Sequence, residues 1–145
     1  MTTPRFQTYD FGAFVAVFGP VVMDGYQDGE GFTIEHSSDA FTKKSGTDGK
    51  VTRCAMKDRS ARVTFKLMAN SACNDQLSLI YNLDRNAPNG AGVGQLLIKD
   101  NSGRSRFFAA EAWIAKAPDV TADREVTSRE WAIDVAFLEE VHGGN

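Results

Sequence analysis

Residues 50–85 read KVTRCAMKDRSARVTFKLMANSACNDQLSLIYNLDR and carry the clearest structural signals in the chain. Residues 51–56 and 62–67 read as two strands, and a helix follows them. In residues 62–67 apolar side chains alternate with hydrophilic ones, and this period of two places the apolar ones on one face of a strand. The stretch therefore predicts a sheet with one helix packed on it.

The helix is predicted over about residues 71–85. Asn70 and Ser71 offer an N-cap oxygen for the unpaired N–H groups of the first turn, and Asp75 places a negative charge near the positive end of the helix dipole. An apolar stripe with spacings of three and four can pack on the strands, and its members are Cys73, Leu77, Ile80 and Tyr81. The sequence NAPNG at residues 86–90 ends the helix.

Further strands are indicated by alternation, by apolar runs and by the turn residues between them. We expect them at residues 10–18, 21–23, 32–36, 95–99, 104–116 and 128–138. These segments predict a mainly β fold, an antiparallel sandwich or barrel-like sheet with one packed helix.

Length and charge limit the possibilities further. The chain of 145 residues suits a single domain, residues 1–145, with residues 139–145 as a flexible tail. Its formal net charge is −3, and it shows no concentrated basic patch of the kind that grips duplex DNA. No apolar signal-peptide core or membrane span is visible, so we expect a soluble protein with no membrane contact. Cys54 and Cys73 are expected to be free, buried thiols.

No pattern in the sequence predicts catalysis, a cofactor or a metal. His36 and His142 are far apart in the chain, and no G-x-S-x-G nucleophile motif is present. Asp24, Asp28 and Glu30 do not have the spacing of a calcium-binding loop. We therefore expect a protein that is not an enzyme, with no cofactor and no metal site.

Contacts between copies are the more promising interpretation. Residues 37–49 form a long polar segment that carries an aromatic residue, and long loops in compact domains are commonly functional. The strand at residues 10–18 is apolar on both faces, so a second sheet or a neighbouring subunit should cover it. The residues that we predict at a subunit interface are Phe41, Lys43, Lys44 and Asp48 in the loop, and Phe14 and Phe18 in the strand.

Four motifs in order give the chain a family resemblance. A D-R-S turn lies at residues 58–60, a V-T-x-x-L strand at 63–67, a helix start S-A-x-N-D at 71–75, and A-E-A-W-I-x-K-x-P-D at 110–119. Together they resemble the small tail tube proteins of contractile-tailed bacteriophages, over roughly residues 10–138.

The resemblance implies a sandwich-like fold whose subunits form six-membered rings that stack into a hollow tube. In that case DNA passes through the lumen without specific binding. The implied partners are other copies of the chain, the tail sheath, a tail initiator or baseplate protein and a tail terminator. The implied location is the virion tail, after synthesis in the cytoplasm of the bacterial host. The long loop at residues 37–49 would then reach a neighbouring subunit or ring.

Two alternatives remain open at this point. Related inner tubes occur in contractile bacteriocins and in type VI secretion systems. In a different class, a soluble β-sandwich could hold a ligand between Trp113 and Trp131, although both tryptophans fit better as core anchors.

Overall fold

A single antiparallel sheet of eight strands forms the body of the protein in the computed structural model, which describes residues 9–27, 29, 31–87, 89–101 and 103–144. The strand order is β2-β1-β7-β8-β9-β6-β3, with β10 paired to β8. The strands of this sheet are β1 (Phe14–Phe18), β2 (Val21–Val22), β3 (Phe32–His36), β6 (Ala61–Met68), β7 (Gly94–Asp100), β8 (Arg106–Lys116), β9 (Ser128–Val135) and β10 (Glu139–Val141). This confirms the mainly β prediction. Asp28 and Glu30, which were considered as calcium ligands, lie outside the described residues.

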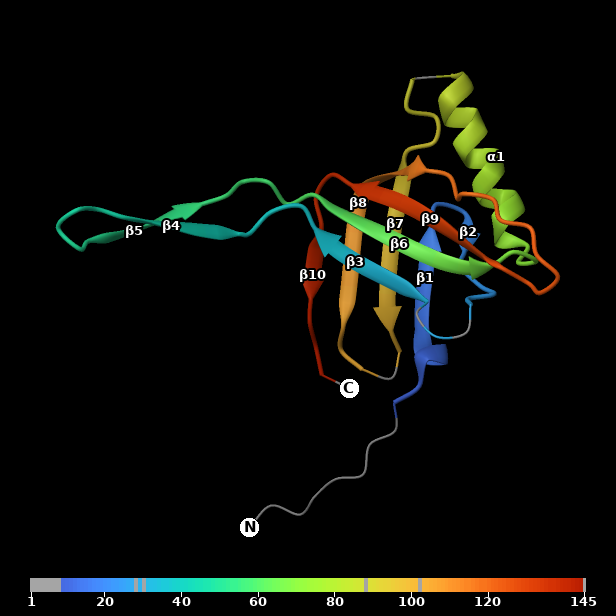
Figure 1. Cartoon of the computed structure of the whole chain (residues 1–145), viewed down its shortest axis with the longest axis horizontal. Helices are drawn as coiled ribbons and strands as arrows, with labels where there is room; N and C mark the ends of the chain where they lie inside the picture. Colours follow the sequence, from blue (N-terminus) through green and yellow to red (C-terminus); the bar gives the residue numbers. More distant parts are fainter. Residues whose placement is uncertain (1–8, 28, 30, 88, 102, 145) are drawn as a thin grey trace, which may run out of the picture.

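The sheet bends back on itself. In Figure 1, β3, β6 and β9 run across β1, β7 and β8. Although β1 and β3 stand near opposite ends of the strand order, the rings of Phe14 and Phe32 lie 5.6 Å apart, edge to face. Two register shifts, one between β7 and β8 and one between β8 and β9, accompany this bend, as bulges commonly do. The body is therefore barrel-like, with its core inside the curve.

The core follows from the alternation of the strands. Along β6, Val63, Phe65 and Leu67 are fully buried, and the residues between them face outward. On β9, Ile133 lies directly opposite Val63 and Trp131 lies directly opposite Phe65, on the same face of the sheet. Burying these side chains removes large apolar areas from water, at about 25 cal/mol per Å². The predicted role of Trp131 as a core anchor is confirmed by its 3% exposure.

The helix α1 (Cys73–Asn86) packs against β2 and β8. Cys73 and Leu77 are buried, and Tyr81 meets Trp131 edge to face with 6.4 Å between ring centroids. The predicted apolar stripe is thus the packing face. The helix begins at Cys73 rather than at residue 71, and its N-cap residue is Ala72. Ser71 lies one residue before the N-cap, and its Oγ accepts the Cys73 N–H at 3.3 Å.

Four sequence-based expectations need correction. The segment at 10–18 begins with one 3-10 turn, Phe11–Ala13, because the Asp10 carboxylate accepts the Gly12 N–H at 2.9 Å. Residues 51–56 do not join the main sheet. The last long strand stops at Val135, and Phe137 beyond it is 46% exposed. The tail expected at 139–145 contains β10, which pairs with β8 through three residue pairs, while Asn145 lies outside the described residues.

The two cysteines are free, as expected, but only Cys73 is buried, and Cys54 is exposed. Within the described residues, no helix has the length and apolar character needed to cross a membrane.

Candidate assembly surface

A two-stranded hairpin leaves the body and points away from it (Figure 1). It consists of β4 (Phe41–Ser45) and β5 (Val51–Ala55), and among the described strands each pairs only with the other. We call residues 38–59 the arm. The segment at 37–49 was predicted as a loop, but its residues 41–45 form a strand, because residues 51–55 supply a hydrogen-bonding partner across a turn at Gly49, whose φ is +84°.

The arm has no core of its own. Every residue from 39 to 59 is exposed, and these include large apolar side chains: Phe41 is 53% exposed, Val51 62% and Met56 43%. The Arg53 guanidinium lies over the Phe41 ring, 4.3 Å from its centroid, which covers only part of that ring. An isolated two-stranded hairpin is at best marginally stable in water. The arm therefore exposes apolar side chains that the rest of the described subunit does not bury.

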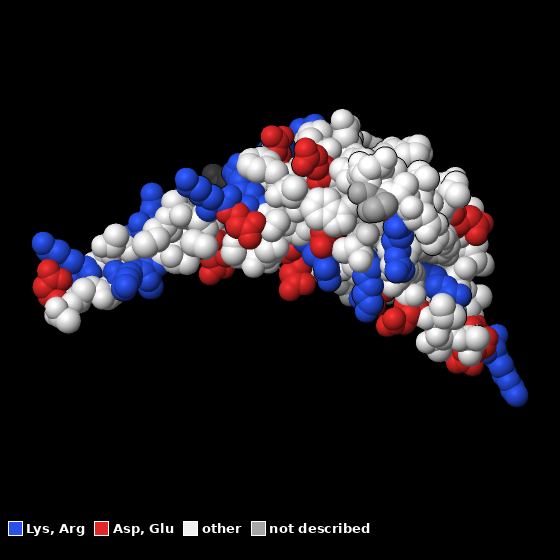
Figure 2. Space-filling model, turned by 90° about the horizontal axis from the view of Figure 1, so that it is seen from above, with Lys and Arg blue, Asp and Glu red and all other residues white. Residues whose placement is uncertain are grey.

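The charge of the arm is opposite to that of the body. The arm carries six lysines and arginines against three aspartates, a formal charge of +3. Since the whole chain carries −3, the remainder carries −6. Figure 2 shows Lys and Arg side chains along most of the arm.

The predicted contact residues in the arm fall on different parts of it. Cross-strand register places Phe41 and Lys43 on one face of the hairpin, together with Arg53, and Lys44 on the other. Asp48 lies at the tip, where its Oδ1 accepts the Lys50 N–H at 3.2 Å.

The predicted contact residues in β1 lie on the buried side of their strand. Phe18 is 1% exposed and belongs to the core of the subunit, and Phe14 packs against that core. The opposite face of β1 is the one left open, and Val15 on it is 37% exposed. Register places Val15, Val17 and Val22 together on this outer face, and Val22 is 58% exposed. Only one face of this two-faced strand is thus covered within the subunit.

Short hydrogen bonds fix the root of the arm. The Oγ atoms of Ser37 and Ser60 are hydrogen-bonded to each other at 3.0 Å, and the Ser37 N–H donates to the Ser60 carbonyl. The Asp58 carboxylate accepts from both the N–H and the Oγ of Ser60 and forms a tight turn. These hydrogen bonds, that of the side chain first, lower the pKa of Asp58. The D-R-S motif therefore forms the turn through which the arm returns to β6.

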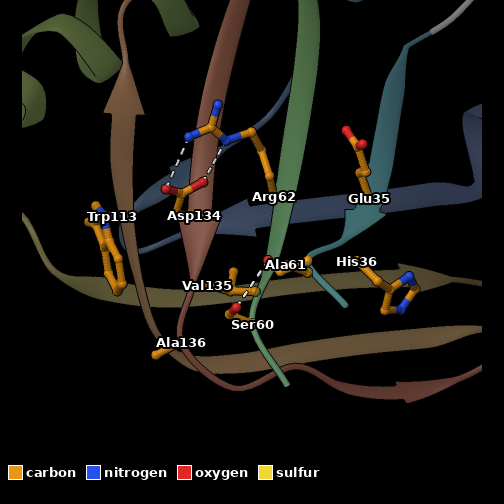
Figure 3. Close-up of a pocket in the computed structure, with 10 residues that line it drawn as sticks. Glu35, His36, Ser60, Ala61, Arg62, Trp113, Asp134, Val135 and Ala136 are labelled. Atoms are coloured by element: carbon orange, nitrogen blue, oxygen red, sulfur yellow. Dashed lines mark hydrogen bonds and ion pairs between the residues drawn. The ribbon is translucent and has the colours of Figure 1, made fainter. Parts of the chain in front are cut away.

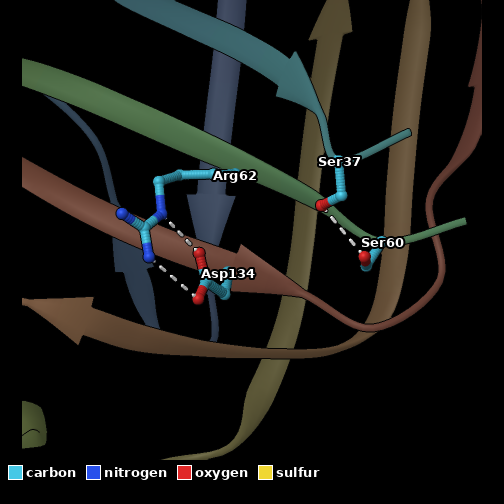
Figure 4. A network of polar contacts seen from close by, with 4 residues as sticks. All are labelled: Ser37, Ser60, Arg62 and Asp134. Atoms are coloured by element: carbon cyan, nitrogen blue, oxygen red, sulfur yellow. Dashed lines mark hydrogen bonds and ion pairs between the residues drawn. The ribbon is translucent and has the colours of Figure 1, made fainter. Parts of the chain in front are cut away.

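An open groove of about 470 Å³ lies beside this root (Figure 3). Arg62 on β6 and Asp134 on β9 are direct cross-strand partners, and both line this groove. The Arg62 Nε donates to the Asp134 Oδ1 at 2.7 Å, and the Nη2 donates to Oδ2 at 3.2 Å (Figure 4). The hydrogen bond to Asp134, followed by its charge, raises the pKa of Arg62. Trp113 lines the same groove and is half-buried, so only one of the two tryptophans is a full core anchor.

The helix-start motif at residues 71–75 has a structural role. The Asn74 amide donates to the carbonyls of Met68 at 2.9 Å and of Ala69 at 3.3 Å. Its oxygen accepts the indole N–H of Trp131 at 2.9 Å. This asparagine therefore ties the end of β6, the helix and β9 together.

Sequence reasoning missed several exposed apolar positions. Leu79 and Leu83 lie one turn apart on the outer face of α1 and are 72% and 53% exposed. Their spacing of four residues could have indicated a second apolar face of the helix. It was overlooked because the stripe that packs on the sheet is longer and adjoins it. Val51 and Met56 were missed because residues 51–56 were placed in the central sheet.

The bent sheet with one packed helix and an exposed hairpin arm defines a mainly β structural domain. Comparison with known proteins identifies the family: the chain belongs to the bacteriophage PhiTE tail tube protein family, whose model matches residues 10–143. It is a structural protein of the phage tail and not an enzyme. The chain is also 35% identical over 123 residues to structural protein ORF10 of Pseudomonas phage KPP10, an alignment that covers 85% of this chain and 71% of that protein.

Solved structures show the same fold at low sequence identity. The tube-terminating cap of the anti-feeding prophage superposes with a TM-score of 0.60 at 9% identity, and covers 97% of this chain and 95% of the cap chain. A chain of the sheath–tube complex of an extracellular contractile injection system gives 0.59 at 11% identity, with 92% of this chain and 91% of that chain covered. A sheath/tube terminator structure of the same kind of system gives 0.59, with 94% and 99% covered.

Proposed function

We propose that the chain assembles with copies of itself into stacked six-membered rings that form the hollow tube through which phage DNA leaves the virion. The observation that carries this proposal is the arm: a stretch from residue 39 to residue 59 with every residue exposed and no core of its own. Membership of a tail tube family supports the same assembly.

The arm is proposed to dock on a neighbouring copy. Its apolar side chains would be covered there, and its +3 charge would meet a body that carries −6. Complementary charge of this kind steers association and fixes register more than it adds affinity. Phe41, with Lys43 and Arg53 on the same hairpin face, is the proposed contact, and Lys44 and Asp48 would meet other parts of the neighbour.

Contacts within a ring are proposed to involve the body. The strands β2 and β3 lie at the two ends of the strand order, and sheet edges readily pair with another chain. The open apolar face of β1 and β2, with Val15 and Val22, adds area that a neighbouring subunit could bury.

A conduit must let DNA slide. Basic side chains on a lumen would hold phosphates through counterion release, so a chain with a net charge of −3 suits such a lumen. The likeness to sheath–tube and terminator structures supports a tube that works with a sheath and ends at a terminator protein. An initiator or baseplate protein is proposed to start assembly.

The test combines negative-stain electron microscopy with sedimentation velocity on the purified chain at low and high concentration. We expect rings or hollow tubes, either from the chain alone or after addition of the tail initiator. A chain that stays monomeric under both conditions would contradict the proposal.

A matched pair of charge reversals sharpens this test. The double variant Lys43→Glu and Lys44→Glu should prevent stacking and leave the circular dichroism spectrum unchanged. The control, Lys116→Glu with Arg124→Glu, changes the net charge equally but lies outside the arm. Equal loss of assembly in both variants would show that overall charge, and not the arm, controls stacking.

A further inference from the structure

Both histidines of the chain meet at one place on the body. His36, at the end of β3, places its Nε2 2.7 Å from the Glu140 Oε2, although the two residues are 104 positions apart. The His142 Nε2 lies 3.5 Å from the same oxygen. The three ligand atoms all lie within 4.8 Å of one another.

The fold holds each of these side chains in place. His36 ends a strand that pairs with β6, and Glu140 sits in β10, opposite Phe107 on β8. The His142 ring packs edge to face on Phe107, with 5.1 Å between centroids, and lies 6.5 Å from the His36 ring. The cluster therefore joins the C-terminal segment to the strand that leads into the arm.

The residue types fit a zinc ion. Two imidazoles and one carboxylate are zinc ligands, and three protein ligands with water in the fourth position make an open tetrahedral site. With bonds of about 2.0–2.1 Å, ligand atoms in such a site lie roughly 3.3 Å apart. His36 and Glu140 would need to separate slightly and the two histidines to approach, which rotation of partly exposed side chains allows.

The cluster is open to solvent. The Glu140 side chain is 30% exposed, so water can reach it and fill a coordination position.

We propose that His36, Glu140 and His142 form a zinc-binding site that clamps the C-terminal strand β10 to the end of β3. This site lies outside the surfaces assigned to the arm, and it does not depend on tube formation. When zinc is bound, the root of the arm and the end of the chain are cross-linked through one ion.

The experiment is a calorimetric titration of untagged protein with zinc chloride, because a polyhistidine tag would bind the metal itself. All proteins carry Cys54→Ser, which removes the exposed thiol as a competing ligand. We expect one zinc ion per chain and a higher melting temperature in its presence. Cobalt(II) in place of zinc should give the visible absorption bands of a four-coordinate site.

Ligand and control variants decide the assignment. His36→Ala, His142→Ala and Glu140→Gln should each weaken zinc binding by at least about tenfold, since even residues that only support a metal site cost that much when replaced. Glu139→Gln removes the same charge one residue earlier on β10 and should leave the affinity unchanged. His142→Ala changes a residue beyond the last strand, so it tests the site without disturbing the sheet.

Two results would overturn the assignment. One is a Cys54→Ser protein that takes up no zinc at millimolar metal. The other is a set of ligand variants that bind zinc as tightly as Glu139→Gln does.

Discussion

The arm and the body show two ways in which the same chain uses antiparallel strands. In the body, Phe65 on β6 is completely buried between the halves of the bent sheet. In the arm, Phe41 on β4 is 53% exposed and has only the Arg53 guanidinium over its ring. Both residues sit in regular antiparallel strands with paired backbones.

The difference shows that strand formation and core formation are separate. A strand needs only a hydrogen-bonding partner, whereas stability needs apolar surface removed from water. The body meets both needs within one subunit. The arm meets only the first within the subunit, and in the proposed tube a neighbouring copy would meet the second.

The largest expected effect comes from removing the arm. Replacing residues 38–59 with an Asn-Gly turn should abolish assembly, because Ser37 and Ser60 already lie close enough to be joined. The melting temperature of the monomer should change little, since the arm contributes no buried residue from 39 to 59. Electron microscopy and a thermal melt measure the two effects. A variant that unfolds would mean that the arm supports the body.

The next largest difference is expected between alanine substitutions at Phe65 in the body and Phe41 in the arm. Phe65→Ala should lower the free energy of unfolding by about 3–5 kcal/mol, because it leaves a cavity in the core. Phe41→Ala, the matched change in the arm, should cost the monomer within about 0.5 kcal/mol, as surface substitutions do. Urea denaturation measures both. Similar costs at the two positions would contradict the division between arm and body.

A smaller effect is expected for the asparagine that joins three elements of the body. Asn74→Ala leaves the indole N–H of Trp131 without its partner, and it should destabilise the protein by about 1–3 kcal/mol. Asn82→Ala, on the exposed side of the same helix, should be neutral or slightly stabilising, because alanine is the better helix former. Chemical denaturation at constant pH compares the two variants.

The smallest effect is expected at the groove beside the root of the arm. Asp134→Asn removes the ion pair with Arg62, whose side chain is 49% exposed, so the cost should be at most about 1 kcal/mol. High salt should reduce this cost further, because screening weakens exposed ion pairs. Glu125→Gln in the exposed connector is the control. A cost well above this range would mean that the pair is more shielded from water than its exposure indicates.

The periodicity of the sequence predicted much of the body. Alternation in residues 62–67 and the spacing of Cys73, Leu77 and Tyr81 identified the faces that are buried. The sequence-based prediction was wrong where the local pattern of a strand does not reveal which part of the molecule packs on it. Residues 51–56 read as a core strand, but their partner is β4 and no second layer covers them. In β1, both faces are apolar, and only the bend of the sheet shows that Phe14 and Phe18 take the inner one.

The candidate surfaces were predicted unevenly. The segment at 37–49 was marked from its length and from Phe41, although its pairing with residues 51–55 was not foreseen. The cluster of His36, Glu140 and His142 was not predicted at all, because its members are separated by up to 106 positions and the tail was expected to fray. Only the pairing of β10 with β8 brings them to one place.

Sequence patterns were enough to predict the class of fold, the helix, the inward face of β6 and the absence of a catalytic motif. These follow from spacings of two, three and four residues, which depend only on near neighbours in the chain. The tertiary structure alone decided that β4 and β5 leave the body, that Phe18 is core and Val15 is surface, and that both histidines meet at Glu140. These depend on strand order and sheet curvature, which arise from contacts between residues far apart in the chain.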